Sequence, residues 1–102
     1  MKHILALTFG LVAAATLTRD TCAKMNVVTT STMVTDMVKE VGGDRINVVG
    51  LMGPGVDPHL YKPASGDVVK LQRAKVIFYS GLMLEGRMSD LFFKMARGGK
   101  KV

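Results

Sequence analysis

The sequence is poor in cysteine and histidine, with one cysteine and two histidines among 102 residues. A single cysteine excludes a disulfide within the chain, and cleavage of a leader after Ala23 would leave no thiol nucleophile. No second histidine, cysteine or close carboxylate pair follows His59 at a metal-site spacing, and His3 lies at the very start. From residue type alone, an ordinary structural role explains His59 better than metal ligation does.

The chain also has few charges near its start. A short basic opening, an uncharged and mainly apolar run over 4–18, and small residues at 21 and 23 predict a secretory signal peptide over 1–23. The apolar run is too short for a transmembrane helix. Lipid attachment at Cys22 is disfavoured, because residues 19–21 (RDT) are not small and apolar as in a bacterial lipobox. We predict ordinary cleavage, with an uncleaved membrane anchor as the alternative.

The net charge is +6, and much of the basic surplus lies near the end, in Lys94, Arg97, Lys100 and Lys101. A basic end can contact phosphate or anionic lipid, but cations also suit the C-terminus of a helix. No aromatic residues are interleaved with these charges, as single-stranded nucleic acid would require. We therefore expect a solvated helix end and no nucleic-acid partner.

The first half of the remaining chain reads as strand, helix, strand. Residues 26–30 (NVVTT) are mostly β-branched, and Thr30 or Ser31 is a suitable helix cap. An apolar helical stripe follows and ends at a glycine pair, its members being Met33, Val34, Met37, Val38 and Val41. Residues 46–51 form an apolar run without alternation, which predicts a strand buried on both faces of a parallel sheet.

The second half repeats the pattern. Ser65 is expected to cap a helix with Asp67 in its first turn, and residues 76–80 form the next strand. A third amphipathic helix begins near Glu85, and residues 100–102 resemble the opening of a fourth strand. The fold class is therefore α/β, a parallel sheet with flanking helices, in one unit over 24–102. So short a sheet leaves apolar faces uncovered, and we expect marginal stability.

The loop over 53–61 (GPGVDPHLY) separates the second strand from the second helix. Its glycines and prolines restrict the backbone and present the His59 imidazole and the Asp57 carboxylate. In parallel α/β sheets, ligands bind beyond the carboxyl ends of strands, where this loop begins. This position strengthens His59 as a ligand-contacting residue.

Three segments carry a resemblance to a known family: 49–61 (VGLMGPGVDPHLY), 65–74 (SGDVVKLQRA) and 76–85 (VIFYSGLMLE). Together they resemble the zinc- and manganese-binding solute-binding proteins of ABC importers. The resemblance implies the N-terminal lobe of a two-lobed protein in the periplasm or at the cell surface, with an ABC permease as partner. It makes His59 the first ligand of a zinc or manganese ion. Asp57 and Glu85 would brace loops or support the ligand, the alternative being solvated acids.

The family's other ligands, a second histidine of the same lobe and two from the other lobe, have no counterpart in these 102 residues. One imidazole cannot complete a zinc site, so we expect an N-terminal part that does not bind metal tightly by itself. A surface adhesin of the same family and a non-functional fragment are the alternatives. A hydrolase using His59 and Asp57 is not expected, because the sequence offers no activated nucleophile or second base.

Overall fold

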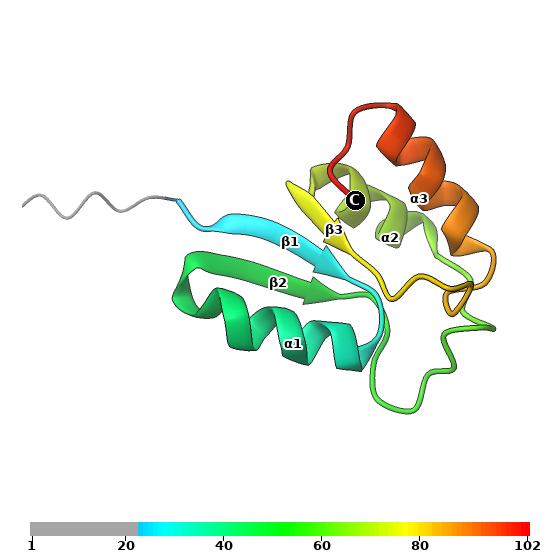
Figure 1. The fold of residues 1–102 in the computed structure, drawn as a ribbon, viewed down its shortest axis with the longest axis horizontal. Coiled ribbons are helices and arrows are strands. Elements are labelled where there is room, and N and C mark those ends of the chain that lie inside the picture. Colours follow the sequence, from blue (N-terminus) through cyan, green and yellow to red (C-terminus); the bar gives the residue numbers. More distant parts are fainter. Residues whose placement is uncertain (1–22) are drawn as a thin grey trace, which may run out of the picture.

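The computed structural model describes residues 23–102. The predicted signal peptide lies outside these residues apart from Ala23. The described part is a three-stranded parallel sheet with helices on both faces (Figure 1). Its elements are β1 (Met25–Thr29), α1 (Thr32–Gly42), a 3-10 turn (Gly43–Arg45), β2 (Ile46–Gly50), α2 (Ser65–Arg73), β3 (Val76–Phe78) and α3 (Met88–Arg97). The predicted α/β class and the order of elements are confirmed.

The strand order is β2-β1-β3, which places the first strand in the centre. β1 pairs along its whole length with β2, from Met25 opposite Ile46 to Thr29 opposite Gly50. It also pairs with β3, Val28 lying opposite Ile77. All three strands run in the same direction, so their carboxyl ends meet at one edge of the sheet.

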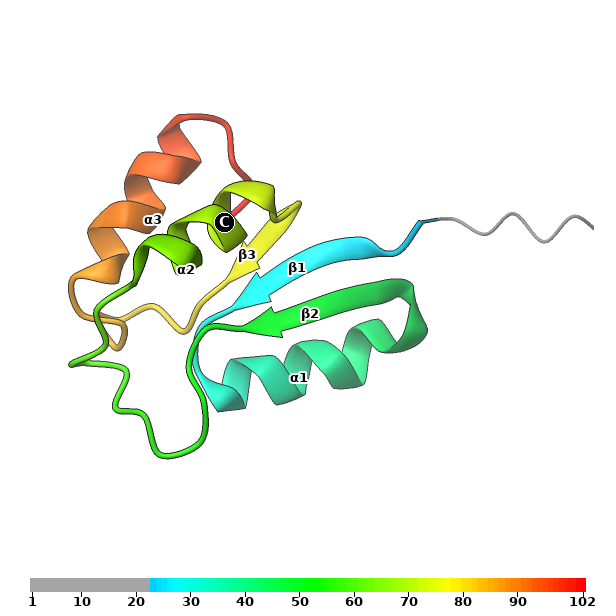
Figure 2. The ribbon, with the colours of Figure 1, turned by 180° about the vertical axis from the view of Figure 1, so that it is seen from behind.

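The main core lies between the sheet and helices α2 and α3, which cover the face opposite α1 (Figures 1 and 2). Val28 and Ile77 point into it from the sheet, and the rings of Tyr79 and Phe92 lie 4.8 Å apart between centroids. Burial of each large apolar side chain contributes about 1.5–3 kcal/mol. The buried members are Val28, Met52, Leu71, Ala74, Ile77, Met88 and Phe92.

On the other face, α1 covers β2 and β1 only in part. Ser31 caps this helix, its Oγ accepting from the Val34 amide at 3.5 Å, and Gly43 ends it with φ of 51°. Of the predicted apolar stripe only Val34 is fully buried, whereas Val41 is 90% exposed. The apolar face of α1 is thus larger than the area that β1 and β2 cover. A cavity of about 300 Å³ therefore remains open, lined by Met25, Val27, Met37, Val38, Val41, Gly42, Ile46 and Phe78.

The prediction that the second strand is buried on both faces is wrong. β2 lies at the edge of the sheet, α1 half-buries Ile46 and Val48, and Val49 on the opposite face is 41% exposed. Helices α2 and α3 pack over β1 and β3 and do not reach β2. The segment over 46–51 (INVVGL) is therefore an edge strand. The elements that pack beside a strand, and not its sequence pattern, decide which of its faces are buried.

Two helix starts also differ from the prediction. Ala64, not Ser65, is the N-cap of α2, and the Asp67 carboxylate accepts the Ala64 amide at 2.9 Å. Helix α3 begins at Met88 because Glu85 belongs to the preceding turn. The expected fourth strand does begin: the Ile77 amide donates to the Lys101 carbonyl at 2.9 Å, beside β3.

None of the helices in the described part of the chain has the length and apolar character needed to cross a membrane.

Candidate metal-binding loop

The loop over 51–64 leaves the carboxyl end of β2 and is fastened at both ends. At its start, the Leu51 and Met52 amides donate to the Thr29 and Thr30 carbonyls at 2.9 and 3.1 Å, and Met52 is buried in the core. At its end, the Tyr61 hydroxyl donates to the Asp67 carboxylate of α2. The intervening residues are thus held between the sheet and a helix.

The Tyr61–Asp67 contact alters the protonation of both groups. Burial, and then the hydrogen bond to Asp67, raises the pKa of Tyr61 to about 12. For Asp67, burial raises the pKa, but the Tyr61 hydroxyl and the Ala64 amide outweigh it and leave the pKa below its ordinary value. Both groups therefore stay in the states that make this bond, a neutral phenol and a carboxylate, around neutral pH.

Within the loop, two tight turns present His59. The Val56 amide donates to the Gly53 carbonyl at 3.3 Å, and the Leu60 amide to the Asp57 carbonyl at 3.2 Å. Gly55 has φ of 79°, a backbone angle that favours glycine. The second turn places Asp57 directly against the histidine that follows it.

Asp57 Oδ1 accepts the His59 backbone amide at 2.9 Å and lies 3.0 Å from His59 Nδ1. A carboxylate can only accept, so Nδ1 must carry the proton and donate it. In the neutral ring, Nε2 then keeps its lone pair free for a ligand. The His59 amide, followed by its side chain, holds the pKa of Asp57 below its usual value, which keeps the acceptor charged. The sequence placed both residues in the loop but did not predict this contact.

The side chains of His59 and Asp57 are 61% and 54% exposed. The imidazole is therefore accessible to solvent at the carboxyl edge of the sheet. A carboxylate on the far nitrogen is the arrangement that orients metal-binding histidines in proteins and raises their basicity. The loop can thus offer one nitrogen ligand to a metal ion.

Glu85 is fully buried, which excludes the solvated-acid alternative for this residue. Its Oε1 accepts the Thr30 hydroxyl at 2.8 Å and the Ser80 amide, and its Oε2 accepts the Gly81 amide at 3.1 Å. Thr30 follows β1 directly, and Ser80 and Gly81 lie just beyond the end of β3. Glu85 therefore braces the carboxyl edge of the sheet, in agreement with the bracing role expected from the resemblance.

The described residues 23–102 hold no group of three or more metal-ligating side chains. His3 lies outside them. His59 and Asp57 alone leave a four-coordinate zinc ion short of ligands.

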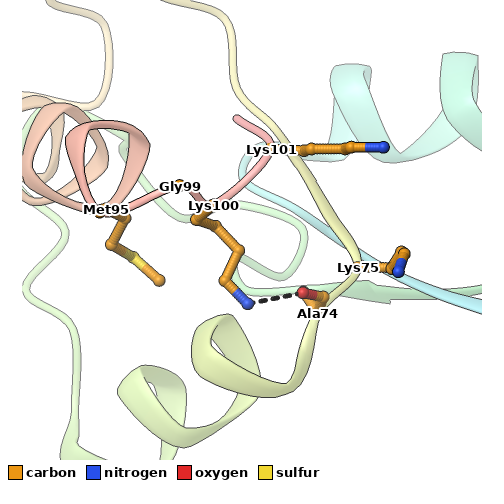
Figure 3. Close-up of a pocket in the computed structure, with 7 residues that line it drawn as sticks. Ala74, Lys75, Met95, Gly99, Lys100 and Lys101 are labelled. Carbon is orange, nitrogen blue, oxygen red and sulfur yellow. Dashed lines mark hydrogen bonds between the residues drawn. The ribbon is translucent and has the colours of Figure 1, made fainter.

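The basic end forms a second hollow, of about 520 Å³, beyond the C-terminus of α2 (Figure 3). Lys100 Nζ donates to the Gln72 and Ala74 carbonyls at 2.7 and 2.8 Å, so this ammonium closes the end of α2. The positive charge of Lys100 thus stabilises the C-terminus of α2, where the partial charge of the helix dipole is negative. Sequence reasoning placed the basic residues at a helix end but took them as solvated, and missed this contact between segments far apart in the chain.

The described residues thus form a parallel α/β lobe with an oriented imidazole at its carboxyl edge, which can offer one nitrogen to a ligand. The chain belongs to the family described as "ZnuA: Zinc-uptake complex component A periplasmic", which matches residues 27–102. That description names a component of an uptake complex, in agreement with the expectation that the chain is not an enzyme.

Relatives support the same assignment. The manganese-binding lipoprotein MntA of Bacillus subtilis is 42% identical over 97 residues, covering 93% of this chain and 32% of the relative. The zinc-binding protein TroA of Treponema pallidum is 49% identical over 76 residues, covering 74% and 24%.

The fold agrees with solved structures of the same group. The structure of TroA from T. pallidum superposes with a TM-score of 0.73 at 48% identity, over 78% of this chain and 28% of that one. Zn(II)-bound AdcA of Streptococcus pneumoniae gives a TM-score of 0.65 at 35% identity, over 72% and 16%. The chain thus spans about a third or less of the length of these proteins.

Proposed function

We propose that residues 24–102 form part of the N-terminal lobe of a metal-binding solute-binding protein, in which His59 supplies one ligand to a zinc or manganese ion. The observation that carries this proposal is the 3.0 Å contact between Asp57 and His59 Nδ1, which leaves Nε2 free at the carboxyl edge of the sheet. Membership of the zinc-uptake family supports it.

The metal is the cargo in this proposal. Imidazole nitrogen is a suitable ligand for both zinc and manganese, so His59 by itself does not select between them. The relatives differ in the same respect: MntA is named for manganese and TroA for zinc. We place the further ligands outside the matched segment, which is 32% of MntA and 24% of TroA.

The remaining parts of the proposal concern delivery and location. The metal is passed to the permease of an ABC importer, and the name of the S. pneumoniae relative PsaA includes "Manganese ABC transporter substrate-binding lipoprotein". Residues 1–23 direct export to the periplasm or cell surface as a signal peptide, with an uncleaved membrane anchor as the alternative. The adhesin role stays a hypothesis.

The test is a zinc titration of the full chain labelled with ¹⁵N in its two histidines, followed by NMR. Because Asp57 holds Nδ1, zinc is expected to shift the Nε2 resonance of His59. His59→Ala should abolish the response and His3→Ala should leave it unchanged. Binding should be weak, since one imidazole is a small part of a zinc site. No zinc-dependent change at His59, or coordination through Nδ1, would refute the proposal.

A further inference from the structure

The turn between β3 and α3 lies directly against the backbone of His59. A Cβ atom added to Gly86 would lie 2.6 Å from the His59 carbonyl oxygen and 3.5 Å from its carbonyl carbon. Separations under about 3.0 Å are not found for real Cβ atoms, so this contact exists only because residue 86 has no side chain. Figures 1 and 2 both show this turn beside the loop that precedes α2.

The same turn is fixed to the sheet by the preceding residue. The buried Glu85 carboxylate joins Thr30, after β1, to the amides of Ser80 and Gly81, after β3. Backbone hydrogen bonds also close the turn, among them one from the Gly86 amide to the Met83 carbonyl at 2.9 Å and one from the Met88 amide to the Glu85 carbonyl at 3.1 Å. Gly86 is thus placed by a brace that involves two of the strands.

The turn holds backbone angles that would not persist without such support. Leu82 and Met83 have φ of 51° and 64°, the left-handed region that residues with a side chain rarely adopt. Strained angles of this kind remain where the surrounding structure over-determines them, and they cluster at ligand-binding sites. Here the Glu85 hydrogen bonds provide that surrounding structure.

We propose that Gly86 is a positioning residue for His59. Because Gly86 has no side chain, the turn over 80–86, anchored by Glu85, packs directly against the His59 carbonyl and limits the movement of the His59 backbone. Asp57 orients the imidazole from within the loop, and Gly86 fixes where the loop itself stands relative to the sheet. As far as it concerns metal affinity, this inference rests on the proposed function. The position of His59 can be measured without metal.

The chain offers a matched control for substitution at Gly86. Gly86 and Gly43 have nearly the same φ, 55° and 51°, but a Cβ at Gly43 meets nothing within 4 Å. Gly43 has ψ of −132°, a backbone conformation that residues with a side chain rarely adopt, so alanine there also carries a backbone penalty. The collision occurs only at Gly86. Gly86→Asn tests the same point, because asparagine tolerates the left-handed region but still carries a Cβ.

The first measurement is metal-free NMR of the full chain, read at the His59 amide and ring nitrogens. Gly86→Ala and Gly86→Asn are expected to shift these resonances and to reduce the fraction of Nδ1-protonated ring, while Gly43→Ala leaves them as in the unmodified chain. Equal changes in the Gly86 and Gly43 variants would mean general destabilisation and would overturn the inference. So would unchanged His59 resonances in Gly86→Ala.

The second measurement is the zinc titration of the same variants. Gly86→Ala is expected to weaken zinc binding at His59 by roughly tenfold, equivalent to about 1.4 kcal/mol, with Gly43→Ala unchanged. If zinc fails to bind the unmodified chain while the metal-free shifts appear, positioning stands and the metal-binding proposal falls. If Gly86→Ala does not fold, Thr30→Val is the second variant, because it removes one donor to Glu85 and leaves the sequence of the turn unchanged. Unchanged His59 resonances in a folded Thr30→Val chain would overturn the inference.

Discussion

At the scale of single residues, the candidate site depends on hydrogen bonds that assign a state to each group. Asp57 remains charged because the His59 amide and ring stabilise its carboxylate, and in return it holds the imidazole by Nδ1. Tyr61 and Asp67 stabilise each other in the same manner at the end of the loop. Each pair joins a group that donates to one that can only accept, so each has a single favourable arrangement.

The first prediction concerns Asp57. Asp57→Ala removes both hydrogen bonds to His59 and should weaken zinc binding by roughly 10–100-fold, the usual loss when the partner of a metal-binding histidine is removed. Asp57→Asn keeps an acceptor oxygen without the charge, so its zinc affinity should lie between those of the unmodified chain and Asp57→Ala. The histidine-labelled zinc titration measures both. Unchanged affinity in Asp57→Ala would show that the aspartate does not support the ligand.

A second prediction follows from the pKa of Tyr61, raised to about 12 from an ordinary value of 10.0. A raised pKa means that folding favours the neutral phenol, so its contribution to stability is complete below pH 10 and is lost as the pH rises toward 12. Phenolate absorbance should therefore show a transition near pH 12. This transition should be absent in Tyr61→Phe and retained in Tyr79→Phe, and the reverse result would contradict the assignment.

At the scale of elements, the turn between β3 and α3 depends on a buried carboxylate that links it to the sheet. Its left-handed residues Leu82 and Met83 are expected to depend on Glu85, whose carboxylate receives three donors. Glu85→Gln keeps Oε1 as an acceptor but turns an amide group toward the Gly81 amide, so that two donors face each other.

The third prediction is that Glu85→Gln lowers the free energy of unfolding by about 1–3 kcal/mol, the penalty for an unsatisfied buried group. Glu40→Gln is the control, because Glu40 is exposed on α1 and surface substitutions stay within about 0.5 kcal/mol. Urea unfolding followed by circular dichroism compares the two. Equal stabilities would show that the Glu85 brace contributes nothing to the fold.

Local patterns predicted the elements well and the contacts between them poorly. Helical spacing, glycine stops and β-branched runs placed the strands and helices, and the loop over 53–61 was expected where it lies, because these signals are local. The burial of Glu85 depends on Thr30, which lies 55 positions earlier. Likewise, the exposure of β2 depends on where α2 and α3 pack. The burial of Glu85 and the exposure of β2 are set by packing between segments far apart in the sequence, so local patterns do not predict them.

At the scale of the whole molecule, the two faces of the sheet are unequally covered. One face carries a closed core centred on Leu71, Ile77 and Phe92, whereas the other leaves an apolar cavity beside α1, where Met37 and Val41 are 62% and 90% exposed. Folding therefore draws most of its hydrophobic stabilisation from one layer. This asymmetry supports the expectation of marginal stability.

The final prediction tests this dependence with two neighbouring phenylalanines of α3. Phe92 is fully buried and Phe93 is 58% exposed, so the same truncation samples the core and the surface. Phe92→Ala should lower the free energy of unfolding by about 3–5 kcal/mol, a large part of the roughly 5–15 kcal/mol of a typical domain, and Phe93→Ala by no more than about 0.5 kcal/mol. Urea titration of the full chain measures the free energy of unfolding of both variants. If both variants lose the same free energy of unfolding, the core between the sheet and helices α2 and α3 is not the main source of stability. The face covered by α1 would then contribute as much.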